Sequence, residues 1–224
     1  MSIQNGNLSD NVYKTLKAQI IERQIRPGKK LDIQELSKQM GVSRMPILDA
    51  ITRLKAEGLI RSKPRVGTYV TPLDETIFEE IFEARNMIEY WVTPQTILHI
   101  RDVDIQELQS LLQHTADLLL NVDNETFDYR HFVELDQQFH LRLIQLCGND
   151  HIIEMYRSLN SHIQIGRAYS LRALDRSREG HDEHEAILKA FAARDVEQAR
   201  AAQHFHAERS HAGVRKLLKE YGTL

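Results

Sequence analysis

Residues 32–58 read DIQELSKQMGVSRMPILDAITRLKAEG, and this stretch decides the fold of the first part of the chain. Apolar residues recur at helical spacing on both sides of Gly41, which predicts a helix before it and a second one from Ser43 to about Glu57. Gly41 is typical of a helix end, the Ser43 hydroxyl can cap the next helix, and Pro46 falls in the first turn, where a helix tolerates it. Two helices joined by a short glycine-containing turn form a helix-turn-helix.

The sequence on either side completes a winged domain. Apolar positions at steps of four predict a preceding helix over about 9–25, capped by Ser9, with Leu8, Val12, Leu16 and Ile20 inward. Residues 59–62 and 67–71 read as two short strands joined by Lys63-Pro64-Arg65-Val66, a basic hairpin tip. We therefore expect a winged helix-turn-helix over residues 1–72.

Charge separates this domain from the rest of the chain. Residues 1–70 hold 13 basic and 6 acidic side chains, whereas residues 71–224 hold 16 and 26. A basic domain suits a polyanion such as double-stranded DNA. The second helix of the pair would enter the major groove and the wing would reach the backbone. The candidate DNA-binding residues are Ser43, Arg44, Met45, Arg61, Lys63, Arg65 and Gly67.

After residue 72 the sequence predicts helices alone. The periodicity indicates six of them, over about 75–99, 103–121, 126–147, 150–173, 178–193 and 196–221, with a kink or break near Pro94. Short turns between long helices predict an antiparallel bundle over residues 73–224. The fold class is therefore mainly α: an N-terminal winged helix-turn-helix and a C-terminal all-α bundle.

The cysteine count and the hydropathy of the sequence indicate the cellular compartment of the protein. The single cysteine, Cys147, excludes an internal disulfide, and no apolar run approaches the length of a membrane span. The first nine residues lack the apolar core of a signal peptide. We expect a soluble cytoplasmic protein that does not meet a membrane.

All eleven histidines follow residue 98, and three of them, with one aspartate, could close round a metal ion. Asp136 and His140 lie one helical turn apart beside an apolar stripe, and His184 precedes an inward face of its own helix. His206 shares a face with apolar residues, whereas His204 projects about 160° away from it. An aspartate and three imidazoles suit a divalent transition ion, with zinc preferred and nickel the alternative.

Two resemblances sharpen these expectations. The run Gly41-Val42-Ser43-Arg44-Met45-Pro46-Ile47-Leu48-Asp49-Ala50, with Glu57-Gly58-Leu59 and the wing 65–70, resembles the DNA-binding domain of the GntR family of bacterial regulators. That family usually carries Thr where Met45 stands and Arg where Leu48 stands, which puts the usual operator half-site in doubt. Arg44 matches the family's other recognition arginine and is the remaining candidate for a guanine contact.

The second resemblance covers residues 75–215. Asp136-Gln137-Gln138-Phe139-His140, Asp182-Glu183-His184-Glu185-Ala186-Ile187-Leu188 and His204-Phe205-His206 resemble the FCD domain of the FadR branch, with all four metal-ligand positions kept. Six helices are similar to the VanR-type subgroup. The resemblance implies a small organic acid bound beside the metal. The residues it implies for that effector are Arg85, Asn160, His162 and Arg167.

These features favour a transcription regulator without enzymatic activity. We expect a homodimer that binds a near-palindromic operator, acts as a repressor, and releases DNA when a small carboxylate occupies the bundle. Tyr90 and Trp91 are interpreted as core or dimer contacts. Two alternatives remain: a metal-dependent enzyme, because an open site could activate water, and a sensor of the metal ion itself.

Overall fold

The helix-turn-helix forms at the predicted place. The computed structural model describes residues 4–170 and 173–223, and the side chains of residues 4–7, 160–164 and 167–170 lie outside its described part. Helix α2 (Ile33–Met40) begins after Asp32, whose carboxylate accepts hydrogen bonds from two backbone amides, and ends at Gly41 with φ +64°. Helix α3 (Arg44–Ala56) follows within three residues. Ser43 takes the capping position but its hydroxyl makes no capping bond, contrary to the prediction.

Helix α1 (Gln4–Ile21) packs across α3 and differs most from expectation. It begins before Ser9, which therefore lies inside the helix and does not cap it. Val12, Leu16 and Ile20 are buried as predicted, but Leu8 is 41% exposed. The apolar spacing places the buried face correctly, whereas the end of the helix that carries Leu8 runs past the core.

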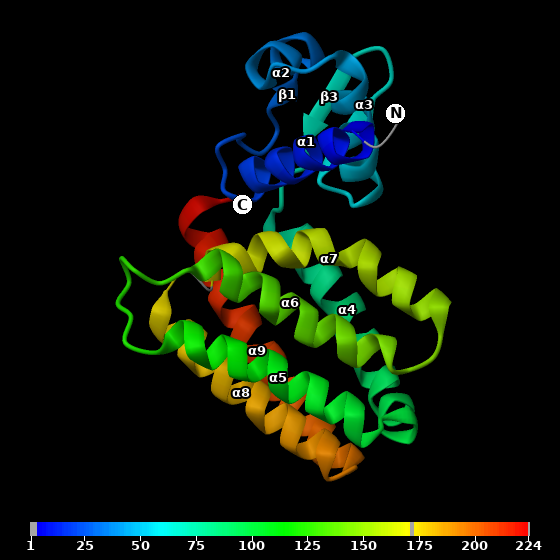
Figure 1. Ribbon diagram of the computed structural model, residues 1–224, viewed down its shortest axis with the longest axis vertical. Coiled ribbons are helices and arrows are strands. Elements are labelled where there is room, and N and C mark those ends of the chain that lie inside the picture. The colour runs from blue at the N-terminus through cyan, green and yellow to red at the C-terminus, as the bar shows by residue number, and fades with distance from the viewer. Residues whose placement is uncertain (1–3, 171–172, 224) are drawn as a thin grey trace.

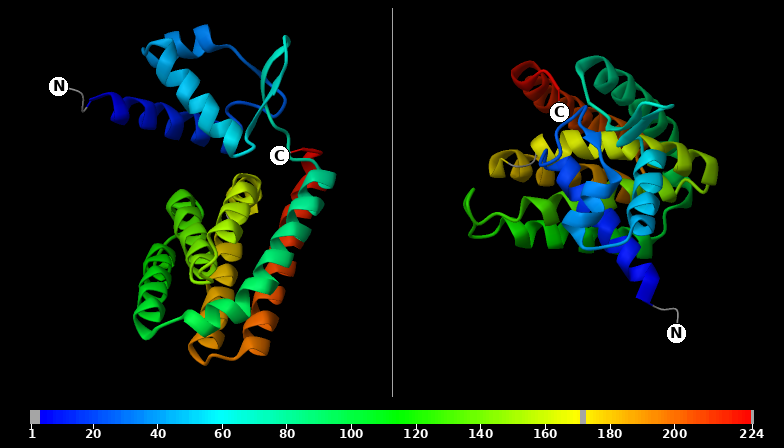
Figure 2. Two further views of the ribbon diagram at one scale, coloured as in Figure 1. Left: turned by 90° about the vertical axis from the view of Figure 1, so that its right-hand side faces the viewer. Right: turned by 90° about the horizontal axis from the view of Figure 1, so that it is seen from above.

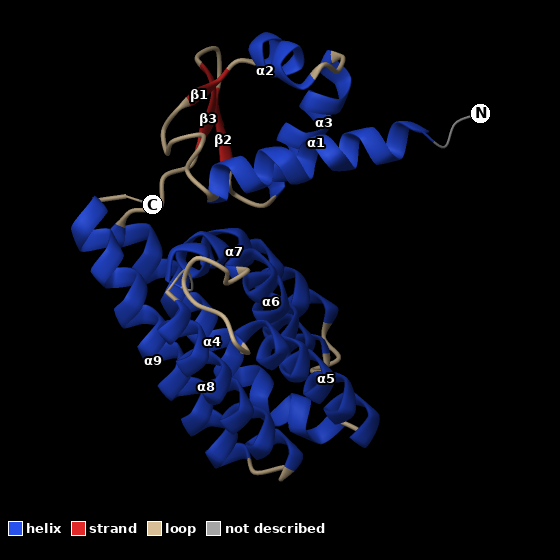
Figure 3. Ribbon diagram, turned by 60° about the vertical axis from the view of Figure 1, so that its left-hand side comes forward, coloured by secondary structure: helices blue, strands red, loops and turns tan. Residues whose placement is uncertain are grey.

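The wing is a three-stranded antiparallel sheet with the order β1-β3-β2. Strand β2 (Ile60–Lys63) pairs with β3 (Gly67–Val70), and the turn between them closes through the Val66 amide and the Lys63 carbonyl, 3.1 Å apart. The third strand, β1 (Lys30–Leu31), pairs with Tyr69 and Thr68 of β3. Two residues are too few to show the alternation that marks a strand, so the sequence did not reveal β1. Figure 3 shows the strands only in this domain.

Within the described part of the chain, six helices form the bundle beneath the winged domain (Figure 1). They are α4 (Glu75–His99), α5 (Asp102–Leu119), α6 (Tyr129–Gln145), α7 (Asp150–Ser170), α8 (Leu174–Ala192) and α9 (Val196–Tyr221). Contacts run round a closed ring in the order α4, α9, α8, α5, α6, α7 and back to α4. The mainly α fold class, a winged helix-turn-helix plus a helical bundle, is confirmed. In the described residues, no helix has both the length and the apolar character needed to cross a membrane.

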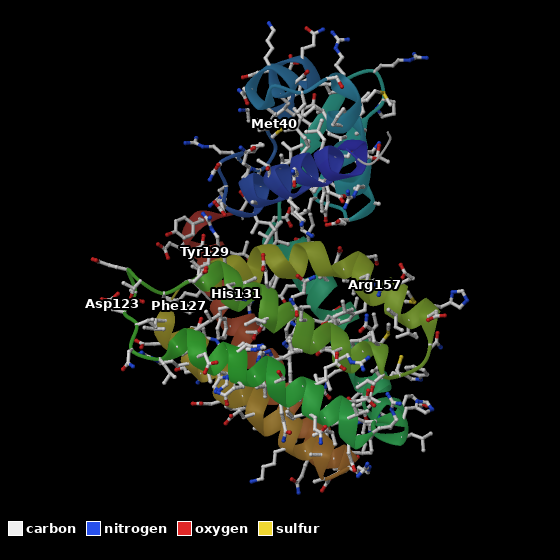
Figure 4. All side chains as sticks on the ribbon, viewed as in Figure 1. Met40, Asp123, Phe127, Tyr129, His131 and Arg157 are labelled. Atoms are coloured by element: carbon white, nitrogen blue, oxygen red, sulfur yellow. The ribbon has the colours of Figure 1, made fainter. Side chains whose placement is uncertain are left out.

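Helix α4 is a single element from Glu75 to His99, so of the predicted kink or break near Pro94 no break occurs. Helix ends in the bundle differ from the sequence prediction by up to four residues. Helix α8 begins at Leu174, four residues before the predicted start, because Leu174 is buried with Phe127 and Phe132 in a small apolar cluster. The connection between α5 and α6 leads into that cluster, with Asp123 on the part that projects from the bundle (Figure 4).

The winged domain and the bundle share buried apolar side chains. One contiguous cluster contains Leu16 and Leu54 of the winged domain together with Phe78 of α4 and Val214 and Leu218 of α9. Figure 2 shows α4 and α9 side by side, with their upper ends beneath the winged domain. Ile165 of α7 belongs to the same cluster, and α7 also contacts α1. The domain that carries the recognition helix is therefore packed on α4, α7 and α9.

Candidate functional site

Three histidines meet inside the bundle. His140 comes from α6, His184 from α8 and His206 from α9, and one ring nitrogen of each lies within 4.8 Å of the others. All three side chains are buried. Helical spacing explains the choice between the two histidines of α9, because His206 is buried whereas His204 is exposed. The predicted face of this helix is confirmed.

Asp136 lies beside two of the three imidazoles. Its Oδ1 lies 3.5 Å from Nε2 of His184 and 3.9 Å from Nε2 of His140, and the two Nε2 atoms are 3.1 Å apart. A tetrahedral ion bound at about 2.0–2.1 Å would hold its ligand atoms about 3.4 Å from one another. Asp136, His140 and His184 lie at about this spacing, and the three buried imidazoles could hold a metal ion.

Neighbouring side chains fix the orientation of two of these rings. His184 stacks on Phe139, with ring centroids 4.7 Å apart and an interplanar angle of 27°. The Nδ1 atom of His206 lies 2.7 Å from Oε2 of Glu183, and the same carboxylate accepts two hydrogen bonds from Arg176 at 3.0 and 2.9 Å. A carboxylate on one ring nitrogen is the usual partner of a histidine whose other nitrogen binds a metal ion.

Glu183 was missed by the sequence reasoning. A signal existed, because Glu183 lies three residues after Gly180 and four before Ile187, and all three are buried on one face of α8. An acidic residue on a buried helical face needs a cationic or hydrogen-bonding partner. Its partners are Arg176 on α8 and His206 on α9, and the sequence predicts His206 only as a metal ligand.

A second buried network surrounds the predicted effector residue Arg85. Its Nε donates to Glu89 Oε1 at 2.8 Å, and the Tyr156 hydroxyl donates to the same oxygen at 3.1 Å. Burial opposes the charge of Arg85, but the attraction of Glu89, reinforced by Tyr156 and Asp136, holds the pKa of the guanidinium above its ordinary value. Glu89 therefore supplies a carboxylate to Arg85 from within the chain. The resemblance implies that Arg85 instead binds the carboxylate of an effector.

The Arg85 network touches the histidine cluster. Arg85 Nη2 lies 3.4 Å from His140 Nδ1, and Glu89 Oε1 lies 3.9 Å from that nitrogen. A guanidinium only donates, so in this arrangement Nδ1 is the acceptor. A metal ion on Nε2 requires the proton on Nδ1 instead, and the nearby carboxylate is Glu89. A hydrogen bond from Arg85 to Nδ1 and a metal ion on Nε2 therefore require different tautomers of the His140 imidazole.

The remaining effector candidates lie on α7. The side chains of Asn160, His162 and Arg167 belong to the part of the chain that the structure does not describe. They remain predictions from the resemblance. Of the predicted effector residues, Arg85 is the one whose surroundings can be stated.

The predicted DNA-binding residues form an accessible surface on α3 and the wing. Ser43, Arg44, Met45, Arg61, Lys63 and Arg65 are all exposed. Gly67 has φ +148°, a backbone conformation that residues with a side chain rarely adopt, so the strand favours glycine at this point. The exposed groups are basic on the wing, whereas on α3 Arg44 is followed by the apolar Met45 and, one turn later, Leu48.

A winged helix-turn-helix on an all-helical bundle with a buried histidine cluster defines a class of DNA-binding regulators with a sensory domain. Residues 8–70 match the bacterial regulatory proteins of the gntR family, and residues 80–209 match the FCD domain. The chain belongs to the GntR family and carries an FCD domain. It is accordingly a DNA-binding transcription regulator and not an enzyme.

Relatives and solved structures agree with this membership. The chain is 31% identical to the HTH-type transcriptional regulator YcbG of Bacillus subtilis, over 92% of this chain and 91% of that protein. It is 24% identical to the HTH-type transcriptional repressor RspR of Escherichia coli, over 95% and 91%. The structure of E. coli McbR/YncC superposes with a TM-score of 0.77 at 22% identity, covering 94% of this chain and 98% of that one, which supports the fold.

Proposed function

We propose that this regulator binds a divalent transition ion at Asp136, His140, His184 and His206, and that a small carboxylate bound beside the ion controls its affinity for DNA. The observation that carries the proposal is the convergence of three buried histidines and one buried aspartate from three helices. Burying an aspartate is costly without a compensating cation, and a metal ion supplies that compensation. Zinc fits the donor set, and nickel is the alternative.

Each residue around the site would have a distinct role. Asp136 and the three imidazoles would hold the ion, which supplies a Lewis-acidic centre for an oxygen ligand. Glu183 would orient His206, and Glu89 would accept a hydrogen bond from the protonated Nδ1 of His140 when the ion binds. Arg85, released from His140, would then present its guanidinium to a carboxylate. Metal binding and acid binding should therefore favour each other.

The pairing of Arg85 with Glu89 restricts how an effector can bind. Because Arg85 already pairs with Glu89, an incoming carboxylate has to share or exchange that guanidinium. Arg85 lies two turns along α4 from Phe78, which belongs to the core shared with the winged domain. Displacement of Arg85 would therefore shift the helix on which the DNA-binding domain rests. A coupling of about 1 to 3 kcal/mol is typical of such linkage.

Assembly and sign of regulation are further parts of the proposal. Met87, Tyr90, Trp91 and Leu98 are exposed apolar residues on one face of α4. Their exposure excludes Tyr90 and Trp91 from the core and supports a homodimer formed through this face of α4. The six-helix bundle favours the VanR-type subgroup. The similarity to RspR, a repressor, favours repression, exerted in the cytoplasm where bacterial DNA lies.

The test combines metal analysis, DNA binding and calorimetry on the full chain. Purified wild type should contain about one transition ion per chain and bind a selected near-palindromic duplex as a dimer. Arg44→Ala should weaken specific binding by about 1 to 3 kcal/mol. Hydroxy-, keto- and dicarboxylic acids should be titrated into wild type, Arg85→Ala and metal-stripped protein. Undiminished acid binding after both changes would refute the effector site.

A second candidate is a sensor of the metal ion alone. The observation in its favour is that Glu89 already satisfies Arg85, so the buried charges need no organic acid. This candidate predicts that metal by itself changes DNA affinity at physiological concentrations. Titrating metal into metal-stripped protein on DNA, with and without acids, distinguishes the two, because only the first requires the acid.

A further inference from the structure

Two apolar side chains stand exposed on the recognition helix. Met45 is 72% exposed and Leu48 is 40% exposed, although the helix buries a full apolar face elsewhere. That buried face consists of Ile47, Ala50, Ile51 and Leu54. The two exposed residues lie three positions apart and are therefore neighbours on the surface of α3. The packing of the winged domain does not use them.

Their place in the domain brings them to the DNA. They lie within the first five residues of α3, beside the exposed Arg44, and the first turns of a recognition helix are the part that meets base edges. The hydroxyl of Thr52, one turn further along, donates to the Leu48 carbonyl at 2.9 Å and so is already engaged within the helix. The exposed residues at this leading edge are Ser43, Arg44, Met45, Leu48 and Asp49, and Met45 and Leu48 are its apolar members.

The major groove offers one apolar group that an apolar side chain can contact. Base pairs present hydrogen-bond donors and acceptors there, and the thymine C5-methyl group is the apolar feature that side chains contact directly. We propose that Met45 and Leu48 read thymine methyl groups, so that the operator half-site carries thymines at the base pairs that these two residues face. Arg44 reads a neighbouring guanine in the same half-site. This inference rests on the DNA-binding function and adds its specificity.

The experiment removes single methyl groups from the DNA. Selection from random duplexes with the full-length protein gives the half-site, and each enriched thymine is then replaced by uracil, which lacks only the methyl group. Loss of one buried methyl contact should weaken wild-type binding roughly fourfold. Met45→Ala and Leu48→Ala should each bind the thymine and uracil duplexes equally at one position, because the partner of the methyl group is gone.

Two further variants complete the design. Leu120→Ala removes an apolar side chain that is 62% exposed at the end of α5, in the bundle, and should keep the full methyl dependence. Leu48→Arg should replace the thymine at its position by guanine in a new selection, since arginine pairs with guanine in the major groove. Because both α3 positions are exposed, these variants should fold.

The possible failures are distinguishable. A selected site that wild type binds equally with thymine or uracil overturns the inference and leaves the DNA-binding function intact. Methyl dependence that persists in both Met45→Ala and Leu48→Ala overturns it as well. Selection that enriches no sequence at all contradicts the sequence-specific function from which the inference starts.

Discussion

Glu183 Oε2 lies 2.7 Å from Nδ1 of His206 in the interior of the bundle. The contact joins a residue next to one candidate ligand, His184, to the ring of another on a different helix. Arg176 donates to both oxygens of the same carboxylate, so the position of Glu183 does not depend on the histidine alone. The orientation of the His206 ring is thus set before any ion arrives.

Replacing this carboxylate should weaken metal binding while leaving the bundle folded. Glu183→Gln removes the charge that holds the Nδ1 proton of His206, and loss of such a partner typically lowers metal affinity 10- to 100-fold. Competition with a chromophoric chelator measures the effect. Glu185→Gln changes an exposed residue of the same helix and should behave like wild type. Equal affinities for the two variants would contradict the role of Glu183.

The two histidines of α9 provide a matched pair. His206→Ala should abolish stoichiometric metal and remove the stabilisation that metal gives to heat unfolding, because it deletes a buried ligand. His204→Ala changes an exposed ring two residues away and should retain both. Elemental analysis and thermal melts with and without chelator supply the measurements. Metal loss in His204→Ala alone would reverse the assignment.

Glu89→Gln should make the protein dependent on an added carboxylate. The change leaves Arg85 buried without its negative partner, which should cost about 3 kcal/mol of unfolding free energy. Acetate or propionate should then raise the melting temperature of the variant more than that of wild type. Glu83→Gln, exposed on the same helix, is the control. A variant as stable as wild type and indifferent to acids would show that Arg85 needs no carboxylate.

The wing should contribute affinity without sequence preference. Lys63 and Arg65 are exposed at and beside the hairpin turn, where they can reach phosphates but are not on the reading helix. Lys63→Ala should weaken binding to every duplex and lower the slope of log affinity against log salt by about 1. Affinity measured at several salt concentrations, on selected and random DNA, tests this. A loss confined to the selected duplex would instead place Lys63 on a base.

Acid should remove one identifiable contribution to stability. Asp104 accepts hydrogen bonds from Arg101 and from Arg142 of α6, and the Arg101 side chain is the main cause that lowers the pKa of its carboxyl. Because the pKa of Asp104 is lower in the folded protein, its stabilisation is complete above the pKa of the unfolded chain, about 3.9. The stabilisation is lost as the pH falls through the pKa of Asp104 in the folded protein. Asp104→Asn should therefore cost about 1 to 2 kcal/mol at pH 7.

Urea unfolding between pH 7 and pH 3 measures that contribution. The difference between wild type and Asp104→Asn should shrink below about pH 4, when Asp104 itself takes up a proton. Asp117→Asn, exposed on the same helix, should show little difference at any pH. A difference between wild type and Asp104→Asn that stays constant down to pH 3 would assign the effect to packing.

Helical periodicity accounts for most of what the sequence could predict. It placed the buried faces of α3 and α6 and separated His206 from His204, because burial repeats every three to four residues whatever the partner. Helix ends were less predictable. The early start of α8 depends on Leu174 meeting Phe127 and Phe132, which lie more than forty residues away in the chain.

The networks round the metal site were harder to foresee. Arg85 and Glu89 lie four residues apart, so their pairing is local and could have been expected. The contact between Glu183 and His206 joins two helices, and a single sequence does not reveal it. Strand β1 was missed for the same reason, since it exists only because β3 pairs with it.

The apolar cluster that continues from Leu16 through Phe78 to Leu218 has a consequence for engineering. A boundary drawn near residue 72 separates two sequence families but cuts through this shared interior. Grafting the winged domain onto another sensory module would expose Phe78 and its neighbours to water unless the upper turns of α4 and α9 travel with it. The transplantable piece of this molecule is therefore discontinuous in sequence: it includes the chain up to about residue 82, the part of α7 that carries Ile165, and the last turns of α9.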